Sequence, residues 1–388
     1  MAKKLVLVWL TLLMVLFSSI SIYADENVQG DFFVKHVIVN GEEIINYNLQ
    51  YPFILYGSTL YIPLTDGIGE ICGFHATVDW ESHTLKLLKT DSTKKNISSN
   101  WMKNDNVDLL CTVISDMTVT AYGANIAVNT SEGAVTSEGA VAAETTKEAV
   151  SEASSPAVMT IAGEDVGEFA AEQIQLAANT PVLYAGGNLY LPLRAFTGGE
   201  QFNWDIHFDP YYGVCISTDP SVPASSYVDS QELLRNMGYV AYIKQANSTV
   251  GTCLAQNYVF FFKRAAYLYG VDEQLLMSIA RRESHFGYNC GGYSPTKAAG
   301  IMQILPSTGA RVGLSLEDLY DPYKNIMYGA LYISERINAY DGNWVLGLSA
   351  YNQGSAKVNR GSYSTAYATK VLETYNTINT YLAQNGYV

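Results

Sequence analysis

One glutamate stands on the apolar side of an expected helix, where a carboxyl group could do acid chemistry. Residues 272–284 have helical periodicity, and Asp272 is placed to cap the first turn. The face that carries Glu283 is otherwise formed by Leu276, Ile279 and Ala280. A carboxyl group on such a face loses hydration, which raises its pKa toward values at which it donates a proton near neutral pH. From this helix alone, a surface glutamate paired with a neighbouring arginine is the more frequent case.

The motifs that follow this helix favour the catalytic interpretation. Four of them occur in a fixed order, namely YSP from Tyr293, AGIMQILP from Ala299, DPYKNI from Asp321 and AYNQG from Ala350. Together with ESHF from Glu283, this set closely resembles the soluble lytic transglycosylases, whose catalytic domain has the goose-type lysozyme fold. Each motif alone is weak, whereas the ordered set is highly specific.

The resemblance implies roles for individual residues. Glu283 is expected to be the sole catalytic acid and base, and Ser294 to lie near the N-acetyl group of the bound muramic sugar. The substrate groove is expected to include Gly300, Met302, Gln303, Tyr351, Asn352 and Tyr367, the last of which closes it. Gly300 and Met302 also have simpler explanations, a tight backbone and core packing respectively.

The sequence departs from the family pattern at two places. The loop from Glu283 to Ser294 is longer than usual, which leaves the placement of Ser294 open, and Leu305 stands where methionine is frequent. The second change conserves volume and is mild. Asp321-Pro322 is interpreted as a helix start, with Asp as the cap and Pro at the first helical position.

The number of acidic residues bears on the reaction. Hydrolases of the usual kind need two carboxylates, yet no acidic residue occurs between Glu283 and Glu317, and the acids from Glu317 to Asp321 have turn or capping explanations. The resemblance implies that protonated Glu283 donates to the oxygen linking N-acetylmuramic acid to N-acetylglucosamine. The carboxylate then takes the proton of the muramic C6 hydroxyl, which closes a 1,6-anhydro ring. No cofactor and no metal are implied.

Two other functions stay open. A true muramidase on the same fold would place a water molecule where the C6 hydroxyl attacks. A non-catalytic wall-binding protein would retain the fold after losing activity, although the presence of Glu283, Gln303, Tyr351 and Asn352 argues against it.

The elements that must position these residues are helices. From Tyr227 onward the apolar spacing is helical, which predicts helices near 228–246, 252–269, 272–286, 322–340, 343–352 and 364–384. Residues 227–388 are therefore expected to form a mainly α, lysozyme-like catalytic domain. Pro and Ser residues at 219–226 indicate a linker before it.

Two stretches of the N-terminal half repeat each other. YPFILYGSTLYIPL begins at Tyr51 and TPVLYAGGNLYLPL begins at Thr180. Residues 36–90 and 158–218 resemble the copper amine oxidase N-terminal-like module, and each copy is expected to be β-rich. No cluster of metal ligands accompanies them, so no copper is inferred. The expected fold class is α+β, with small β-rich repeated modules before the helical domain.

The first residues have the layout of a secretory signal peptide. Lys3-Lys4 precedes an apolar run, and cleavage is expected after Ala24, so residues 1–24 would be removed. An uncleaved membrane anchor is the alternative, because the apolar stretch is just long enough to span a bilayer. The protein is thus expected to be secreted or associated with the cell wall, where the repeated modules could provide attachment to peptidoglycan.

Charge and cysteine content narrow the remaining possibilities. Residues 225–388 hold 13 basic and 11 acidic side chains, so the excess acid behind the net charge of −14 lies in the N-terminal part, and nucleic-acid binding is not expected. The segment 91–157 is uncertain, and its end from residue 131 is a low-complexity insertion. Five widely spaced cysteines indicate free thiols, with a Cys253–Cys290 bridge as the alternative. The oligomeric state is not indicated.

Overall fold

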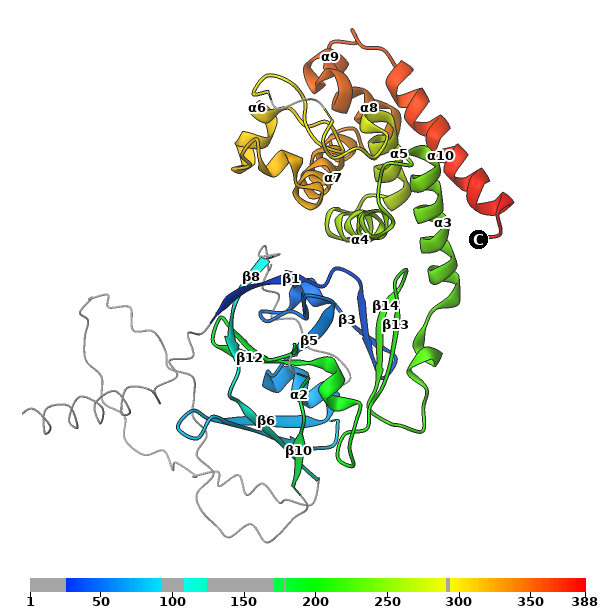
Figure 1. Ribbon diagram of the computed structural model, residues 1–388. Coiled ribbons are helices and arrows are strands. Elements are labelled where there is room, and N and C mark those ends of the chain that lie inside the picture. The colour runs from blue at the N-terminus through cyan, green and yellow to red at the C-terminus, as the bar shows by residue number, and fades with distance from the viewer. Residues whose placement is uncertain (1–25, 93–107, 124–170, 178, 291–293) are drawn as a thin grey trace, which may run out of the picture. The chain divides into compact units, whose positions relative to one another are not determined.

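A computed structural model describes residues 26–92, 108–123, 171–177, 179–290 and 294–388. The predicted signal peptide and the whole of the low-complexity insertion lie outside these ranges. Among the helices that are described, none is both long and apolar enough to cross a membrane. A β-rich N-terminal region and a helical C-terminal region confirm the α+β class (Figure 1).

The chain forms two compact units whose residues alternate along the sequence. The first unit consists of Met1–Phe33, Ile44–Asp205 and Thr218–Ser221, and the second consists of Val34–Glu43, Ile206–Ser217 and Val222–Val388. The second unit thus combines the helices with two segments from the N-terminal half. The chain changes unit at several points, so the single boundary expected at residues 219–226 stays a prediction.

A closed six-stranded barrel forms the core of the first unit. Its strands are, in order, β1 (Asn27–Phe32), β4 (Ile54–Tyr56), β5 (Thr59–Pro63), β12 (Asn188–Pro192), β11 (Val182–Ala185) and β8 (Asp108–Ile114). The strands β5 and β12 carry the two similar motifs and pair antiparallel, with Tyr61 opposite Pro192 and Pro63 opposite Tyr190. Both tyrosine side chains are fully buried in the same apolar cluster. The two motifs therefore share one core.

A four-stranded sheet completes the first unit. Its order is β10 (Glu172–Ile174), β9 (Thr118–Tyr122), β7 (Thr84–Lys89) and β6 (Phe74–Asp79), and β7 runs parallel to β9. Helix α2 (Asp66–Cys72) precedes β6, and the 3-10 helices η1 (Asn46–Asn48) and η2 (Leu193–Phe196) lie in connections. The hydroxyl of Thr65 caps α2, and Gly73 ends it in the left-handed conformation.

A second four-stranded sheet lies almost entirely within the second unit. Its order is β13 (Asp205–Asp209), β14 (Gly213–Ser217), β2 (His36–Val39) and β3 (Glu42–Ile44). The strands β14 and β2 are parallel, with Val214 opposite Val37. A turn at Asn40-Gly41 joins β2 to β3, and both residues have positive φ, at 51° and 85°, as a two-residue hairpin turn requires.

The six predicted helices are confirmed to within two residues at each end. They are α3 (Ser230–Ala246), α4 (Thr252–Tyr269), α5 (Glu273–Ser284), α7 (Pro322–Asn338), α8 (Trp344–Gln353) and α10 (Ala366–Gln384). Asp272 and Asp321 accept hydrogen bonds from the first turns of α5 and α7, so both predicted caps are confirmed. Periodicity did not indicate the one-turn elements α6 (Pro306–Gly309), α9 (Ser355–Asn359), η3 (Ala224–Tyr227), η4 (Ala310–Val312) and η5 (Asp318–Tyr320), because so few residues show no repeat.

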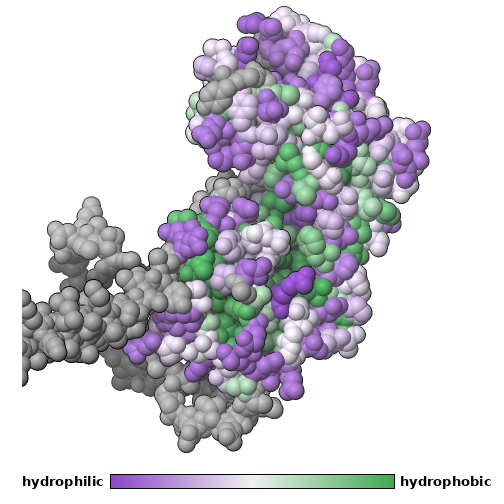
Figure 2. All heavy atoms as spheres, in the orientation of Figure 1, coloured by the Kyte–Doolittle hydropathy of each residue, from purple (hydrophilic) through white to green (hydrophobic). Residues whose placement is uncertain are grey.

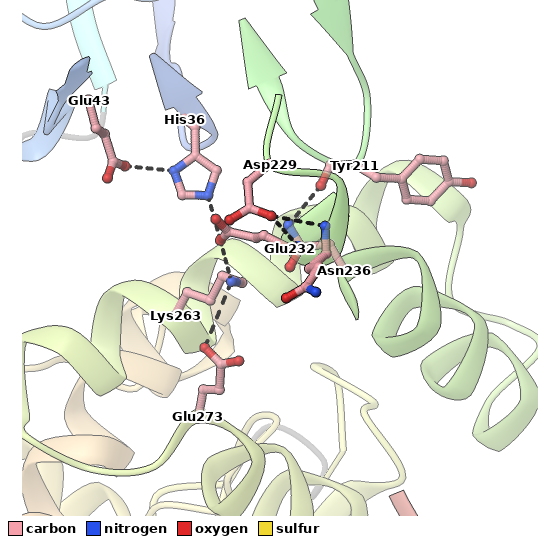
Figure 3. A network of polar contacts seen from close by, with 9 residues as sticks. His36, Glu43, Tyr211, Asp229, Glu232, Asn236, Lys263 and Glu273 are labelled. Atoms are coloured by element: carbon pink, nitrogen blue, oxygen red, sulfur yellow. Dashed lines mark hydrogen bonds and ion pairs between the residues drawn. The ribbon is translucent and has the colours of Figure 1, made fainter. Parts of the chain in front are cut away.

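Charged groups join the small sheet of the second unit to its helices (Figure 3). The ring of His36 on β2 contacts Glu43 on β3 at 2.6 Å and Glu232 on α3 at 2.9 Å. Lys263 on α4 donates to Glu232 at 2.6 Å and lies 4.0 Å from Glu273 on α5. One line of alternating charge therefore runs from the sheet to the first residue of α5. We call these five residues the His36 network.

The cysteines are all described and all free. Cys72, Cys111 and Cys215 are buried, whereas Cys253 is exposed. Burial raises the pKa of the Cys215 thiol to about 11, so it stays protonated at neutral pH. In the described ranges, no group of three His, Cys, Asp or Glu side chains could hold a metal ion.

Candidate active site

Helix α5 is the central element of the site and carries Glu283 in its last turn. Its apolar face is completely buried, at Leu275, Leu276, Met277, Ile279 and Ala280. The hydroxyl of Ser284 donates to the carbonyl of Ile301 at 2.6 Å, which ties the end of the helix to the loop before α6. His285 then ends the helix in the left-handed conformation, with φ of 54°. Glu283 is thus held on a rigid helix end.

The Glu283 carboxyl group is half-buried and has an uncharged partner. Its Oε1 accepts a hydrogen bond from the hydroxyl of Tyr367 on α10 at 2.5 Å. Burial raises the pKa of Glu283, and the Tyr367 hydrogen bond and the charge of Arg282 offset only part of this rise. The net shift has the direction that the apolar helix face predicts, and it favours a protonated acid.

Two parallel tyrosine rings stand beside the carboxyl group. The rings of Tyr351 on α8 and Tyr367 on α10 are 6.4 Å apart and inclined by 11°. The Tyr351 hydroxyl donates to the carbonyl of Met302 at 2.8 Å, and the rings of Tyr332 on α7 and Tyr351 pack edge to face with their centroids 5.3 Å apart. Burial raises the pKa of both stacked tyrosines, so their hydroxyls remain donors at neutral pH.

The loop between Ala299 and Ile304 is folded tightly against α7. Gly300 has φ of 77°, and a Cβ atom there would lie 2.1 Å from the carbonyl oxygen of Leu319. Met302 is fully buried, and its sulfur would lie 2.4 Å from a Cβ atom at Gly329. Both simpler explanations, the tight backbone and core packing, agree with these positions. Met302 nevertheless contributes its backbone carbonyl to Tyr351.

The other expected groove residues have more local surroundings. The half-buried Gln303 has φ of 50°, and its amide donates to the carbonyls of Cys290 and Gly300 at 3.1 and 2.8 Å. The Ser294 hydroxyl is 3.2 Å from that of Thr296. Asn352 is exposed on α8, next to Tyr351. The described contacts thus connect Tyr351 and Tyr367 to the Glu283 site and leave the roles of Ser294, Gln303 and Asn352 as expectations.

Asn325 belongs to the DPYKNI motif, but the motif alone does not predict its role. This asparagine on α7 has no exposed surface, and its Oδ1 accepts a hydrogen bond from the Met302 N–H at 2.8 Å. Its Nδ2 donates to the carbonyls of Leu319 and Ala299 at 2.8 and 3.1 Å. One sequence feature could have indicated this role. Asn325 lies next to Ile326 on the apolar face of a predicted helix, and a buried amide must find hydrogen-bond partners.

Comparison with known proteins gives a consistent assignment for this part of the chain. Residues 260–373 match the family described as the Transglycosylase SLT domain. The Transglycosylase of Enterobacteria phage PRD1 is 31% identical over 112 residues, which is 29% of this chain and 40% of the phage protein. The Membrane-bound lytic murein transglycosylase C of Haemophilus influenzae is 34% identical over 122 residues, 27% of this chain and 34% of the relative.

The similarity is confined to a part of each molecule. The chain spans between 24% and 40% of the length of the curated relatives it matches. The crystal structure of the 70-kDa soluble lytic transglycosylase from Escherichia coli is 23% identical, covers 42% of this chain and 31% of that one, and has a TM-score of 0.26. The similarity to transglycosylase SLT domains thus covers the helices of the second unit that carry Glu283, Tyr351 and Tyr367.

Proposed function

We propose that this protein is a peptidoglycan lytic transglycosylase. It cleaves the β-1,4 bond between N-acetylmuramic acid and N-acetylglucosamine, leaves 1,6-anhydro ends, and serves in cell-wall remodelling. One observation carries the proposal. The half-buried Glu283, with a raised pKa and a tyrosine hydroxyl as its hydrogen-bond partner, lies within the stretch that matches a transglycosylase family.

The reaction uses Glu283 twice. In the first step, its proton passes to the bridging oxygen as the bond from that oxygen to the muramic C1 breaks, and the N-acetyl carbonyl of the sugar stabilises the developing positive charge. In the second step, the muramic C6 oxygen bonds to C1 and its proton returns to the carboxylate. One residue therefore acts as acid and then as base, and no water is consumed. The raised pKa of Glu283 suits the first step, which needs the protonated form.

The remaining expected residues are assigned to substrate binding. Ser294 lies near the N-acetyl group of the muramic sugar, and Gln303 lies in the groove. Tyr351 and Asn352 line the groove beside the acid, and Tyr367 closes it. The parallel tyrosine rings support this assignment, because aromatic faces and edges suit the apolar faces of sugar rings. Gly300 and Met302 shape the groove through the backbone of their loop.

Product analysis tests the proposal directly. The full chain without its signal segment is incubated with purified peptidoglycan, and the released fragments are identified by mass spectrometry. Anhydro ends are expected, and they are lighter by one water molecule than the reducing ends that a muramidase leaves. Reducing ends would establish the muramidase alternative, and the absence of cleavage would leave wall binding as the function.

We also infer that the β-rich region is a duplication. Its support is the strand order, because β6-β7-β9-β10 in one sheet corresponds to β13-β14-β2-β3 in the other, and the barrel pairs β5 with β12. In this arrangement each copy lends strands to the other, and the second copy begins near β8 rather than at residue 158. Both copies belong to the copper amine oxidase N-terminal-like class and attach the enzyme to the wall outside the cytoplasm, after export directed by residues 1–24. Sedimentation with purified sacculi tests this attachment. The protein should sediment with the sacculi, and soluble glycan added as a competitor should reduce the amount that sediments.

A further inference from the structure

Asn325 uses its whole side chain to hold the loop that carries Met302. The side chain has no exposed surface, and three hydrogen bonds occupy its amide, one from the Met302 N–H and two to the carbonyls of Ala299 and Leu319. Its Nδ2 would lie only 2.3 Å from a Cβ atom at Gly300, so the glycine lets the amide approach the loop. The backbone from Ala299 to Met302 is thereby fixed relative to α7.

A continuous series of contacts leads from this amide to the proposed acid. The Met302 N–H donates to Asn325 Oδ1 at 2.8 Å, and the Met302 carbonyl accepts a hydrogen bond from the Tyr351 hydroxyl at 2.8 Å. The Tyr351 ring stacks on the Tyr367 ring at 6.4 Å, and the Tyr367 hydroxyl donates to Glu283 at 2.5 Å. The series includes residues of four helices, α7, α8, α10 and α5. Among its described contacts, only Tyr367 forms a hydrogen bond with the Glu283 carboxyl group.

We propose that Asn325 is a positioning residue that orients the Tyr351–Tyr367 pair, and through it the Glu283 carboxyl group, by fixing the backbone of Met302. The inference rests on the proposed transglycosylase function. Its physical basis is that a catalytic group keeps its geometry only when the residues around it are themselves fixed by packing and hydrogen bonds.

The proposal has a specific consequence for the pH profile. The charged or titratable groups around Glu283 are Arg282 on α5, Tyr351 on α8 and Tyr367 on α10. The Tyr367 hydrogen bond lowers the pKa of Glu283 because it stabilises the carboxylate. Loosening Asn325 weakens that hydrogen bond, so the pKa of Glu283 rises. Activity that requires the protonated acid then persists to higher pH, even though turnover falls.

The test compares Asn325→Ala with Ser334→Ala in the full chain. Ser334 is a matched control, because it is a buried polar residue of the same helix, and its hydroxyl donates to the carbonyl of Tyr269 at 2.7 Å. Turnover on purified glycan strands is measured per folded molecule over a range of pH. We expect Asn325→Ala to lower turnover by about tenfold and to move the alkaline limb upward by roughly half to one pH unit. Ser334→Ala should leave the limb in place.

Tyr351→Phe keeps the inference falsifiable if Asn325→Ala does not fold. This variant removes only the hydroxyl that contacts Met302 and retains the stacked ring. It should also move the alkaline limb upward. Where both single variants fold, the double variant should show less than the sum of their effects, because both interrupt the same series.

The outcomes separate this inference from the proposed function. An unmoved alkaline limb in Tyr351→Phe, or equal limbs in Asn325→Ala and Ser334→Ala, would overturn the positioning role while wild-type protein still forms anhydro products. Absence of any cleavage by the wild-type protein would instead overturn the proposed function. An upward shift confined to the variants of the series supports the inference.

Discussion

Two glutamates of the second unit have comparable burial and opposite protonation behaviour. Burial alone raises the pKa of both carboxyl groups. At Glu232, hydrogen bonds and charges from His36 and Lys263 outweigh burial and lower the pKa to about 2. At Glu283, the partner is the neutral Tyr367 hydroxyl and the Arg282 charge is a smaller effect, so burial prevails and the pKa rises. The charge of the partner, rather than burial, distinguishes a structural carboxylate from one suited to hold a proton.

The two regions also differ in what they connect. Glu232 joins segments that are far apart in the sequence, since His36 lies 196 residues before it. Its negative charge stabilises the unit by pairing the small sheet with α3 and α4 (Figure 3). Glu283 lies at a helix end, where its carboxyl group accepts a hydrogen bond from Tyr367 and, within the described contacts, forms no ion pair. Each prediction below changes one side of this comparison.

The largest effect is expected when Glu283 is replaced by a residue that can neither donate nor accept the proton. Glu283→Gln keeps the shape of the side chain and removes acid and base function. We expect turnover on peptidoglycan to fall by about a thousandfold or more, since general acid–base groups contribute effects of this order. Far-UV circular dichroism should show an unchanged fold. Residual turnover within tenfold of the wild type would contradict the assignment of Glu283.

The His36 network should make the free energy of unfolding fall as the pH becomes alkaline. Burial lowers the pKa of His36, but hydrogen bonds and charges from Glu232 and Glu43 raise it to about 9, above its ordinary value of 6.5. The stabilisation is therefore complete below pH 6.5 and is lost as pH rises through 9. The free energy of unfolding of the second unit should fall by up to about 3 kcal/mol over this interval.

Urea denaturation followed by helical circular dichroism measures this dependence. His36→Gln is the matched control, because it removes the titrating ring while retaining a hydrogen-bonding side chain of similar reach. Its unfolding free energy should be lower at pH 6.5 and nearly independent of pH up to 9, with turnover per folded molecule unchanged. A variant that keeps the wild-type pH dependence would show that another group is responsible.

A smaller effect is expected when the neutral partner of Glu283 is removed. Tyr367→Phe deletes the hydroxyl that stabilises the carboxylate, so the pKa of Glu283 should rise. The alkaline limb of the turnover profile should move upward by up to about one pH unit, corresponding to roughly 1.4 kcal/mol. A shift downward would mean that Tyr367 favours the protonated acid, and the comparison with Glu232 would then fail.

On the face that Figure 2 shows, hydrophobic residues form several patches among hydrophilic ones. The order of residues along the chain indicates the site more clearly than the surface does. The caps Asp272 and Asp321, the apolar spacing of α5, and the direction of the Glu283 pKa shift were all predictable, because each depends on residues a few positions apart.

Other features depended on contacts that local patterns do not encode. The sequence indicated two similar stretches, but it did not indicate that β5 and β12 pair with each other. Nor did it indicate that β2 and β14 pair in a sheet of the second unit. It likewise gave no role to Asn325, although the motif that contains it was recognised.

The sequence by itself determined the helices, their caps and the acid on an apolar face, since these follow from side-chain type and short-range spacing. Only the tertiary structure decided which partner each buried carboxyl group received. Tyr367 is 84 residues from Glu283 in the chain, and His36 is 196 residues from Glu232. A pKa is set by the charges and hydrogen bonds within a few ångströms, and only folding brings such distant residues within that range.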